Sequence, residues 1–150
     1  MVASGSEAHA SSHLSVFASR AGRVDRVLLD ADDRRRRRIV LTGESGMQFL
    51  LDLSAPAVLN DGDGLMLEDG SIVRVMGLVE LLAEATARNV MEFVRLAWHL
   101  GNRHADVQFV DGKLRFRRDH VLEDLAARLG ASVSTINAAF EPQRPAGPAE

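Results

Sequence analysis

The 150-residue sequence contains no cysteine, and this absence excludes whole classes of site. Disulfides, thiolate zinc sites, iron–sulfur clusters and cysteine nucleophiles are all ruled out. A metal bound by this chain must therefore use imidazole, carboxylate, backbone or water ligands. Imidazole suits nickel, copper and zinc, whereas sites built only from carboxylates suit magnesium or calcium.

Long apolar runs are also missing. No stretch approaches the roughly 20 apolar residues that a membrane helix needs. The first residues, M-V-A-S-G-S-E-A-H-A-S-S-H, have neither the cationic start nor the apolar centre of a secretory signal. We therefore expect a cytoplasmic protein without a membrane partner, and a disordered leader over residues 1–14.

The chain has no basic excess and no familiar catalytic motif. Its formal net charge is −3 and its pI is about 5.9, which argues against a nucleic-acid partner. H-E-x-x-H, the P-loop, G-x-S-x-G and the Rossmann glycine pattern are all absent. We therefore expect neither nucleic-acid binding nor enzymatic activity.

Residues 15–77 consist of short alternating segments separated by turn clusters, which predicts a small all-β sandwich or half-open barrel. One cluster, D-G-D-G at residues 61–64, resembles part of a calcium loop but lacks the remaining ligand spacing. We interpret it as a hairpin turn. The expected strands are 23–29, 38–42, 47–53, 64–68 and 71–76.

Five consecutive arginines occupy residues 34–38, just after Asp30, Asp32 and Asp33. We predict a solvated turn and a charged strand edge protected from further pairing. The alternative is a surface for RNA or an acidic partner. The absence of interleaved aromatic residues favours the first interpretation.

Residues 78–141 follow the order β-α-β-β-α-β, which is typical of a ferredoxin-like domain, and residues 142–150 form a flexible tail. Asn89 caps the first predicted helix, which ends at a left-handed Gly101 or Asn102. Asp119 caps the second, and Gly130 ends it. The apolar positions expected to face the core are Val90, Phe93, Val94, Ala97 and Leu100 in the first helix, and Leu122, Leu125, Ala126 and Leu129 in the second.

Asp111 and Gly112 separate two alternating segments, which predicts a type I′ β-hairpin. Leu114 and Phe116 then share one face of the second strand. The opposite face carries Lys113, Arg115 and Arg117.

The five histidines are the only strong metal ligands besides the carboxylates. His9 and His13 fall in the expected leader and carry little weight. His99 lies at the end of the first predicted helix, His104 follows that end, and His120 opens the second helix. The residues alone leave a structural role and a metal site both open. In a dimer with a twofold axis, a single exposed histidine such as His104 would supply two imidazoles. The resulting metal site would be shallow, and its ion would be exchangeable.

Two motifs narrow the choice: G-N-R-H at residues 101–104 and D-H-V-L-E at residues 119–123. Together with R-V-D-R-V-L-L-D, the arginine run, V-L-N-D-G-D and F-E-P in this order, they make the sequence similar to the UreE family of urease accessory proteins, which are nickel metallochaperones. The likeness extends over nearly the whole chain.

The resemblance implies a peptide-binding β domain followed by a ferredoxin-like metal-binding domain that forms a homodimer. His104 from both subunits would hold Ni²⁺, with His120 and His99 as auxiliary positions. Cu²⁺ or Zn²⁺ would also bind in vitro. The partners would be the urease GTPase and the urease maturation complex.

Three departures from the family accompany this likeness. Arg118 stands where some members have histidine, and Asp106 stands where proline is common. The chain ends in Q-R-P-A-G-P-A-E rather than in a histidine-rich tail. These differences argue against high-capacity nickel storage and leave the interfacial site intact.

Two functions of other classes compete with this prediction. One is a protein- or RNA-interaction module that uses the ferredoxin-like sheet and residues 34–38. The other is an enzyme with His104 or His120 as general base, beside Asp106 or Asp119.

Overall fold

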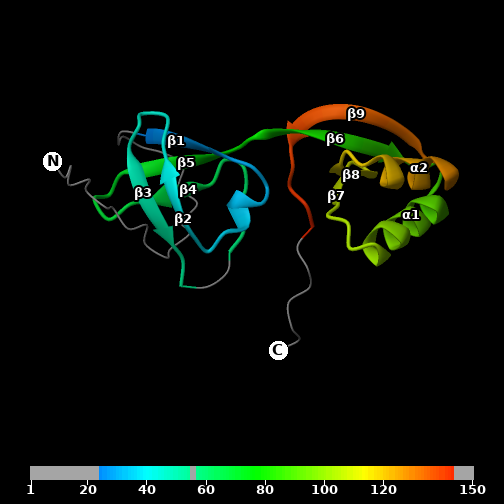
Figure 1. Cartoon of the computed structure of the whole chain (residues 1–150), viewed down its shortest axis with the longest axis horizontal. Helices are drawn as coiled ribbons and strands as arrows, with labels where there is room; N and C mark the ends of the chain where they lie inside the picture. The colour runs from blue at the N-terminus through cyan, green and yellow to red at the C-terminus, as the bar shows by residue number, and fades with distance from the viewer. Residues whose placement is uncertain (1–23, 55–56, 144–150) are drawn as a thin grey trace. The chain divides into compact units, whose positions relative to one another are not determined.

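The computed structural model describes residues 24–54 and 57–143 (Figure 1). The chain divides after Leu78 into two compact units, and each is described by itself. The expected leader, including His9 and His13, and all but the first two residues of the expected tail lie outside the described residues. Within the described ranges, no helix is long and apolar enough to cross a membrane.

The first unit is rich in β-structure, as the sequence predicts. One sheet has the order β1-β5-β4, with β1 parallel to β5, and a second sheet pairs β2 with β3. Alternate residues of both sheets point into one core, which includes Val27, Leu41, Phe49 and Val75. The elements are β1 (Val24–Leu29), the 3-10 helix η1 (Asp33–Arg35), β2 (Arg38–Thr42), β3 (Gln48–Asp52), β4 (Gly64–Met66) and β5 (Ile72–Gly77).

Arg34 contradicts the prediction that the arginine run is solvated. Its side chain is only 1% exposed. The guanidinium donates hydrogen bonds to the carbonyl oxygens of Leu29 at 3.3 Å and Leu59 at 3.4 Å. A buried cation needs such partners because it has lost its hydration. Arg36 and Arg38 are exposed, as predicted, whereas Arg37 also donates a side-chain hydrogen bond to the Leu53 carbonyl oxygen at 2.9 Å.

The D-G-D-G segment is a turn, but it is not the hairpin turn that we expected. It joins β3 to β4, which belong to different sheets. The carboxylate of Asp61 accepts a hydrogen bond from the Gly77 backbone N–H at 2.8 Å, and that of Asp63 accepts one from Asn60 at 2.7 Å. Both carboxylates therefore serve to hold the connection between the two sheets.

The second unit has the predicted βαββαβ arrangement. Its sheet has the order β7-β8-β6-β9 with every neighbouring pair antiparallel. Both helices cover the same face of the sheet (Figure 1). The elements are β6 (Val79–Thr86), α1 (Val90–Asn102), β7 (Gln108–Val110), β8 (Lys113–Arg117), α2 (His120–Arg128) and β9 (Ser132–Ala139).

The predicted hairpin and the two faces of β8 are confirmed. Asp111 and Gly112 both have positive φ, 49° and 73°, as a type I′ turn requires. Leu114 and Phe116 are fully buried in the core that the helices cover. The opposite face is charged.

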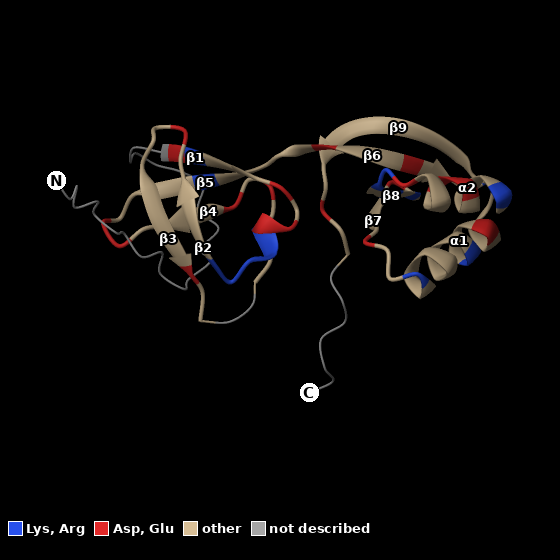
Figure 2. Ribbon diagram, in the orientation of Figure 1, with Lys and Arg blue, Asp and Glu red and all other residues tan. Residues whose placement is uncertain are grey.

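Ion pairs organise this charged face, where basic residues of β8 lie beside acidic residues of β6 (Figure 2). Arg115 and Lys113 contact the two carboxylate oxygens of Glu84 at 2.8 and 3.1 Å. The hydrogen bond from Arg115, followed by that from Lys113, lowers the pKa of the Glu84 carboxyl below its usual value. Arg117 contacts Glu80 at 3.1 Å.

Candidate metal-binding site

His104 holds an unusual backbone position. We expected α1 to end at a left-handed Gly101 or Asn102, but the helix continues through Asn102 and the left-handed residue is His104, with φ of 55°. Its N–H donates to the Gly101 carbonyl at 3.0 Å, and the N–H of Ala105 donates to the Leu100 carbonyl at 3.1 Å. These two bonds form a Schellman motif, which ends a helix with one left-handed residue.

The motif explains how the imidazole is presented. Leu100 is buried in the core of the second unit and Ala105 packs against that core, so the backbone on either side of the turn is anchored. The His104 side chain itself is exposed. The result is a solvent-accessible imidazole on a backbone that two hydrogen bonds fix.

His120 is also exposed, at the first position of α2. The preceding residue, Asp119, caps the helix as predicted: its Oδ1 accepts hydrogen bonds from Val121 N at 2.8 Å and Leu122 N at 3.1 Å. This cap sets the direction in which the chain enters α2 and holds His120 at its start.

His99 lies in the last turn of α1 and is partly exposed. Its ring meets the ring of Trp98 edge to face, with 5.0 Å between the centroids and an angle of 86° between the planes. The contact orients the imidazole beside an exposed indole.

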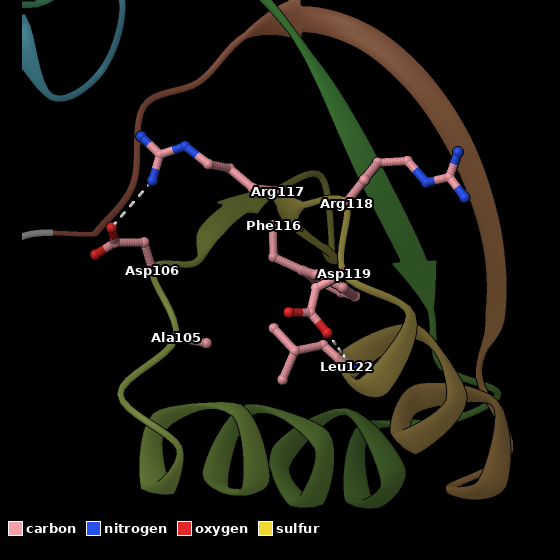
Figure 3. A pocket seen from close by; sticks show the side chains of 7 residues that line it. All are labelled: Ala105, Asp106, Phe116, Arg117, Arg118, Asp119 and Leu122. Atoms are coloured by element: carbon pink, nitrogen blue, oxygen red, sulfur yellow. Dashed lines mark hydrogen bonds and ion pairs between the residues drawn. The ribbon is translucent and has the colours of Figure 1, made fainter.

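One pocket is lined by sequence neighbours of two of these histidines. A cavity of about 160 Å³ lies between the loop that follows His104 and the start of α2 (Figure 3). Ala105, the neighbour of His104, and Asp119, the neighbour of His120, both line it. The pocket therefore lies between the loop that directly follows G-N-R-H and the start of D-H-V-L-E, while the residues beside His99 are not part of its wall. The lining residues are Ala105, Asp106, Phe116, Arg117, Arg118, Asp119 and Leu122.

The donors available in one chain are few. Among the described residues, no group of three or more histidine and acidic side chains could hold a metal ion. The two carboxylates of the pocket are already engaged, since Asp119 caps α2 and Asp106 lies 3.3 Å from Arg117. An ion bound chiefly by His104 therefore needs further donors from another molecule or from water.

The prediction of which α1 residues face the core is partly wrong. Val90 and Val94 were expected in the core, yet they are 79% and 56% exposed, and Trp98 one turn further is 63% exposed. Leu100 is in the core and Phe93 and Ala97 pack against it, as predicted. Leu96, which was not predicted, is buried there as well. Spacing alone cannot separate two apolar stripes on one helix, because both recur every three to four residues.

The comparisons with known proteins point to one family. The model of the UreE urease accessory protein N-terminal domain matches residues 7–76, and that of the C-terminal domain matches residues 80–150.

Curated relatives agree with these family models. A urease accessory protein UreE from Bradyrhizobium sp. (strain ORS 278) is 50% identical over 119 residues, which cover 79% of this chain and 57% of that protein. The UreE of Chelativorans sp. (strain BNC1) is 42% identical over 79% of this chain and 75% of its own length. The chain thus spans somewhat more than half the length of the first of these relatives and three quarters of the second. Covered by both domain models, the chain belongs to the UreE family of urease accessory proteins.

Proposed function

We propose that this chain is a metallochaperone that binds one labile Ni²⁺ ion through His104 and the His104 of a second copy. It delivers the ion in the cytoplasm to the urease maturation complex by way of the urease GTPase. Nickel is the cargo, so transfer proceeds by ligand exchange, and no covalent bond in a substrate changes. The observation that carries the proposal is the exposed imidazole of His104 on a fixed turn, in a member of the UreE family.

The proposed homodimer supplies metal-donor groups that the described part of a single chain lacks. A twofold axis near His104 supplies two imidazoles from one residue. The apolar stripe of α1 (Val90, Val94 and Trp98) supports this assembly, since a contiguous exposed apolar face is typical of an interaction surface. Its burial would bring stability that two histidines and an ion do not provide.

An open site suits a carrier. With two imidazoles and water as ligands, the ion keeps exchangeable positions, so a protein with more donors can extract it. His120 and His99 serve as auxiliary ligands during transfer; His120 follows Asp119, which lines the same pocket as Ala105 and Asp106 in the loop after His104. Cu²⁺ and Zn²⁺ bind the same imidazoles in vitro, because Cu²⁺ exceeds Ni²⁺ in affinity for such ligands.

The first unit would supply contacts with the maturation complex as a peptide-binding domain. Its outer arginines, Arg36 and Arg38, are exposed and offer an attractive surface to an acidic segment.

Nickel calorimetry on the wild type and on His104→Gly, together with the mass of the assembly in solution, tests the proposal. Glycine is the sharpest substitution because it removes the imidazole while accepting the left-handed backbone. We expect the wild type to be dimeric with one nickel site per dimer, tighter than about 100 μM, and His104→Gly to lose that site. Affinity should fall as the pH is lowered, because protons compete with the ion for the imidazole nitrogen.

His99→Gln is the matched control, since it removes a partly exposed imidazole from the same helix end; it should change the tightest site far less than His104→Gly. A wild type without nickel binding, or a His104→Gly variant that binds like the wild type, would leave an interaction module as the better function. In that case partner binding should be salt-sensitive and independent of His104.

A further inference from the structure

Arg117, at the end of β8, joins segments that are far apart in the sequence. Its Nη1 lies 3.3 Å from Asp106 Oδ2, and its Nε lies 3.1 Å from Glu80 Oε1. Its Cζ lies 5.0 Å from the centre of the Phe140 ring, the geometry of a cation–π contact. One guanidinium therefore contacts the loop after His104, the start of β6 and the segment after β9.

Asp106 is the residue through which Arg117 reaches the histidine. It lies two positions after His104, and Figure 3 shows its carboxylate directed at the guanidinium along the edge of the pocket. The Schellman hydrogen bonds hold the chain before this point, and the Asp106–Arg117 bridge holds it after. The turn that carries His104 is thus fixed from both sides.

The segment after β9 supports the same loop. The backbone N–H of Gln143 donates to the Val107 carbonyl at 2.6 Å, and that of Glu141 donates to Gln108 Oε1 at 3.1 Å. Phe140, fully buried, places its ring against Arg117. Residues 106–108 are therefore held between β8 and the C-terminal segment.

The side chains of Arg117 and Asp106 are 36% and 40% exposed. A pair this open adds little to global stability, because water screens it. Its effect is local: it limits the positions that the neighbouring turn can adopt.

We propose that the Asp106–Arg117 bridge is a positioning device that sets how His104 is presented to nickel; this rests on the proposed function. Neither residue is a metal ligand in this proposal. A direct electrostatic effect makes a different prediction. Loss of the negative charge of Asp106 would then weaken nickel affinity, whereas loss of the positive charge of Arg117 would strengthen it.

The two charges can therefore be removed separately. Nickel affinity is measured by calorimetry for the wild type, Asp106→Asn, Arg117→Gln and Arg117→Lys. If positioning is the cause, both neutral variants bind nickel about three- to fivefold more weakly, and Arg117→Lys recovers part of the loss. Both differences from the wild type shrink in 1 M salt, which screens the bridge.

Arg118→Gln is the matched control. Arg118 lines the same pocket and carries the same charge, but it pairs with Glu123 of α2, at 3.0 Å, rather than with Asp106. Its removal should leave nickel affinity unweakened. Equal weakening by Arg118→Gln, or opposite effects of Asp106→Asn and Arg117→Gln, would overturn the proposal.

A second measurement needs no metal. Hydrogen exchange at the His104 and Ala105 amides should become faster in Asp106→Asn and Arg117→Gln, while the thermal midpoint changes little. Unchanged hydrogen exchange contradicts the positioning role, whatever the nickel affinities of the variants are. If exchange quickens while the wild type binds no nickel, the failure belongs to the proposed function and not to the loop.

Discussion

The two helices of the second unit end in the same hydrogen-bond pattern with different residues at the left-handed position. In α2, Gly130 has φ of 88°, its N–H donates to Ala127, and the next N–H, of Ala131, donates to Ala126. In α1, His104 has φ of 55° and makes the equivalent bonds. Ala105 and Ala131 occupy the same place after the turn and pack against the same core.

This difference shows that the end of α1 carries backbone strain that the end of α2 avoids. Glycine takes the left-handed region at little energetic cost, whereas a side chain there is disfavoured by about 1 kcal/mol or more. The α2 end follows this preference, and the α1 end does not. An exposed histidine at a position suited to glycine is therefore a candidate for a functional rather than a structural residue.

Gly130→Ala should have the largest effect on stability. The new Cβ would lie 2.5 Å from Nη2 of Arg88, and the backbone would be strained at a φ of 88°. Because Arg88 is flexible, we expect strain to dominate, with a loss of about 1–2 kcal/mol in the free energy of unfolding, measured by urea denaturation. The Arg88→Ala/Gly130→Ala double variant isolates the backbone contribution. If that double variant is as stable as Arg88→Ala alone, the clash and not the left-handed backbone is the cause.

His104→Gly should act in the opposite direction. Relief of the left-handed strain is expected to raise the free energy of unfolding by about 0.5–1 kcal/mol, despite the greater freedom of glycine in the unfolded chain. The same urea titration measures it, with His99→Gly, in the helix itself, as the destabilised control. A loss of stability in His104→Gly would mean that the imidazole contributes to the fold, and the contrast between the two helix ends would fail.

Glu92→Gln should have the smallest effect, and one that depends on pH. Glu92 holds Arg88 at 2.7 Å, and Arg88 lies over Gly130. The hydrogen bond from Arg88 lowers the pKa of the Glu92 carboxyl. A carboxyl whose pKa is lower in the folded protein stabilises it above the ordinary glutamate pKa, and this stabilisation disappears as the pH falls through the lowered value.

Wild type and Glu92→Gln should therefore differ slightly in thermal midpoint at neutral pH and converge in acid. The pair is exposed, so solvent screening keeps the difference small. A difference that persists or grows in acid would show that Glu92 acts through something other than its charge.

Short-range patterns determined much of this fold. Asn89 and Asp119 cap their helices, Asp111 and Gly112 form the hairpin, and Gly130 ends α2, all as the sequence predicts. These features depend on interactions between residues within about five positions of one another, so neighbours in the sequence carry the information. The motifs around His104 and His120 also suffice to indicate the family, because they are short and contiguous.

Where the sequence offers several residues of the same type, tertiary contacts determine which of them are buried. Arg34 is buried and Arg36 is exposed in one run of arginines, because only Arg34 reaches the carbonyl oxygens of Leu29 and Leu59. Val90 and Val94 lie outside the core because the sheet packs against the stripe that contains Leu96 and Leu100.

The same distinction applies at the site. The sequence placed Arg117 on the outer face of β8, but its pairing with Asp106 depends on the loop and the strand meeting in space. The left-handed residue moved from Gly101 to His104 because the turn ends where Ala105 can enter the core beside Leu100. The sequence determines the residue types available for the proposed metal site, whereas the packing of the core determines how their side chains are presented.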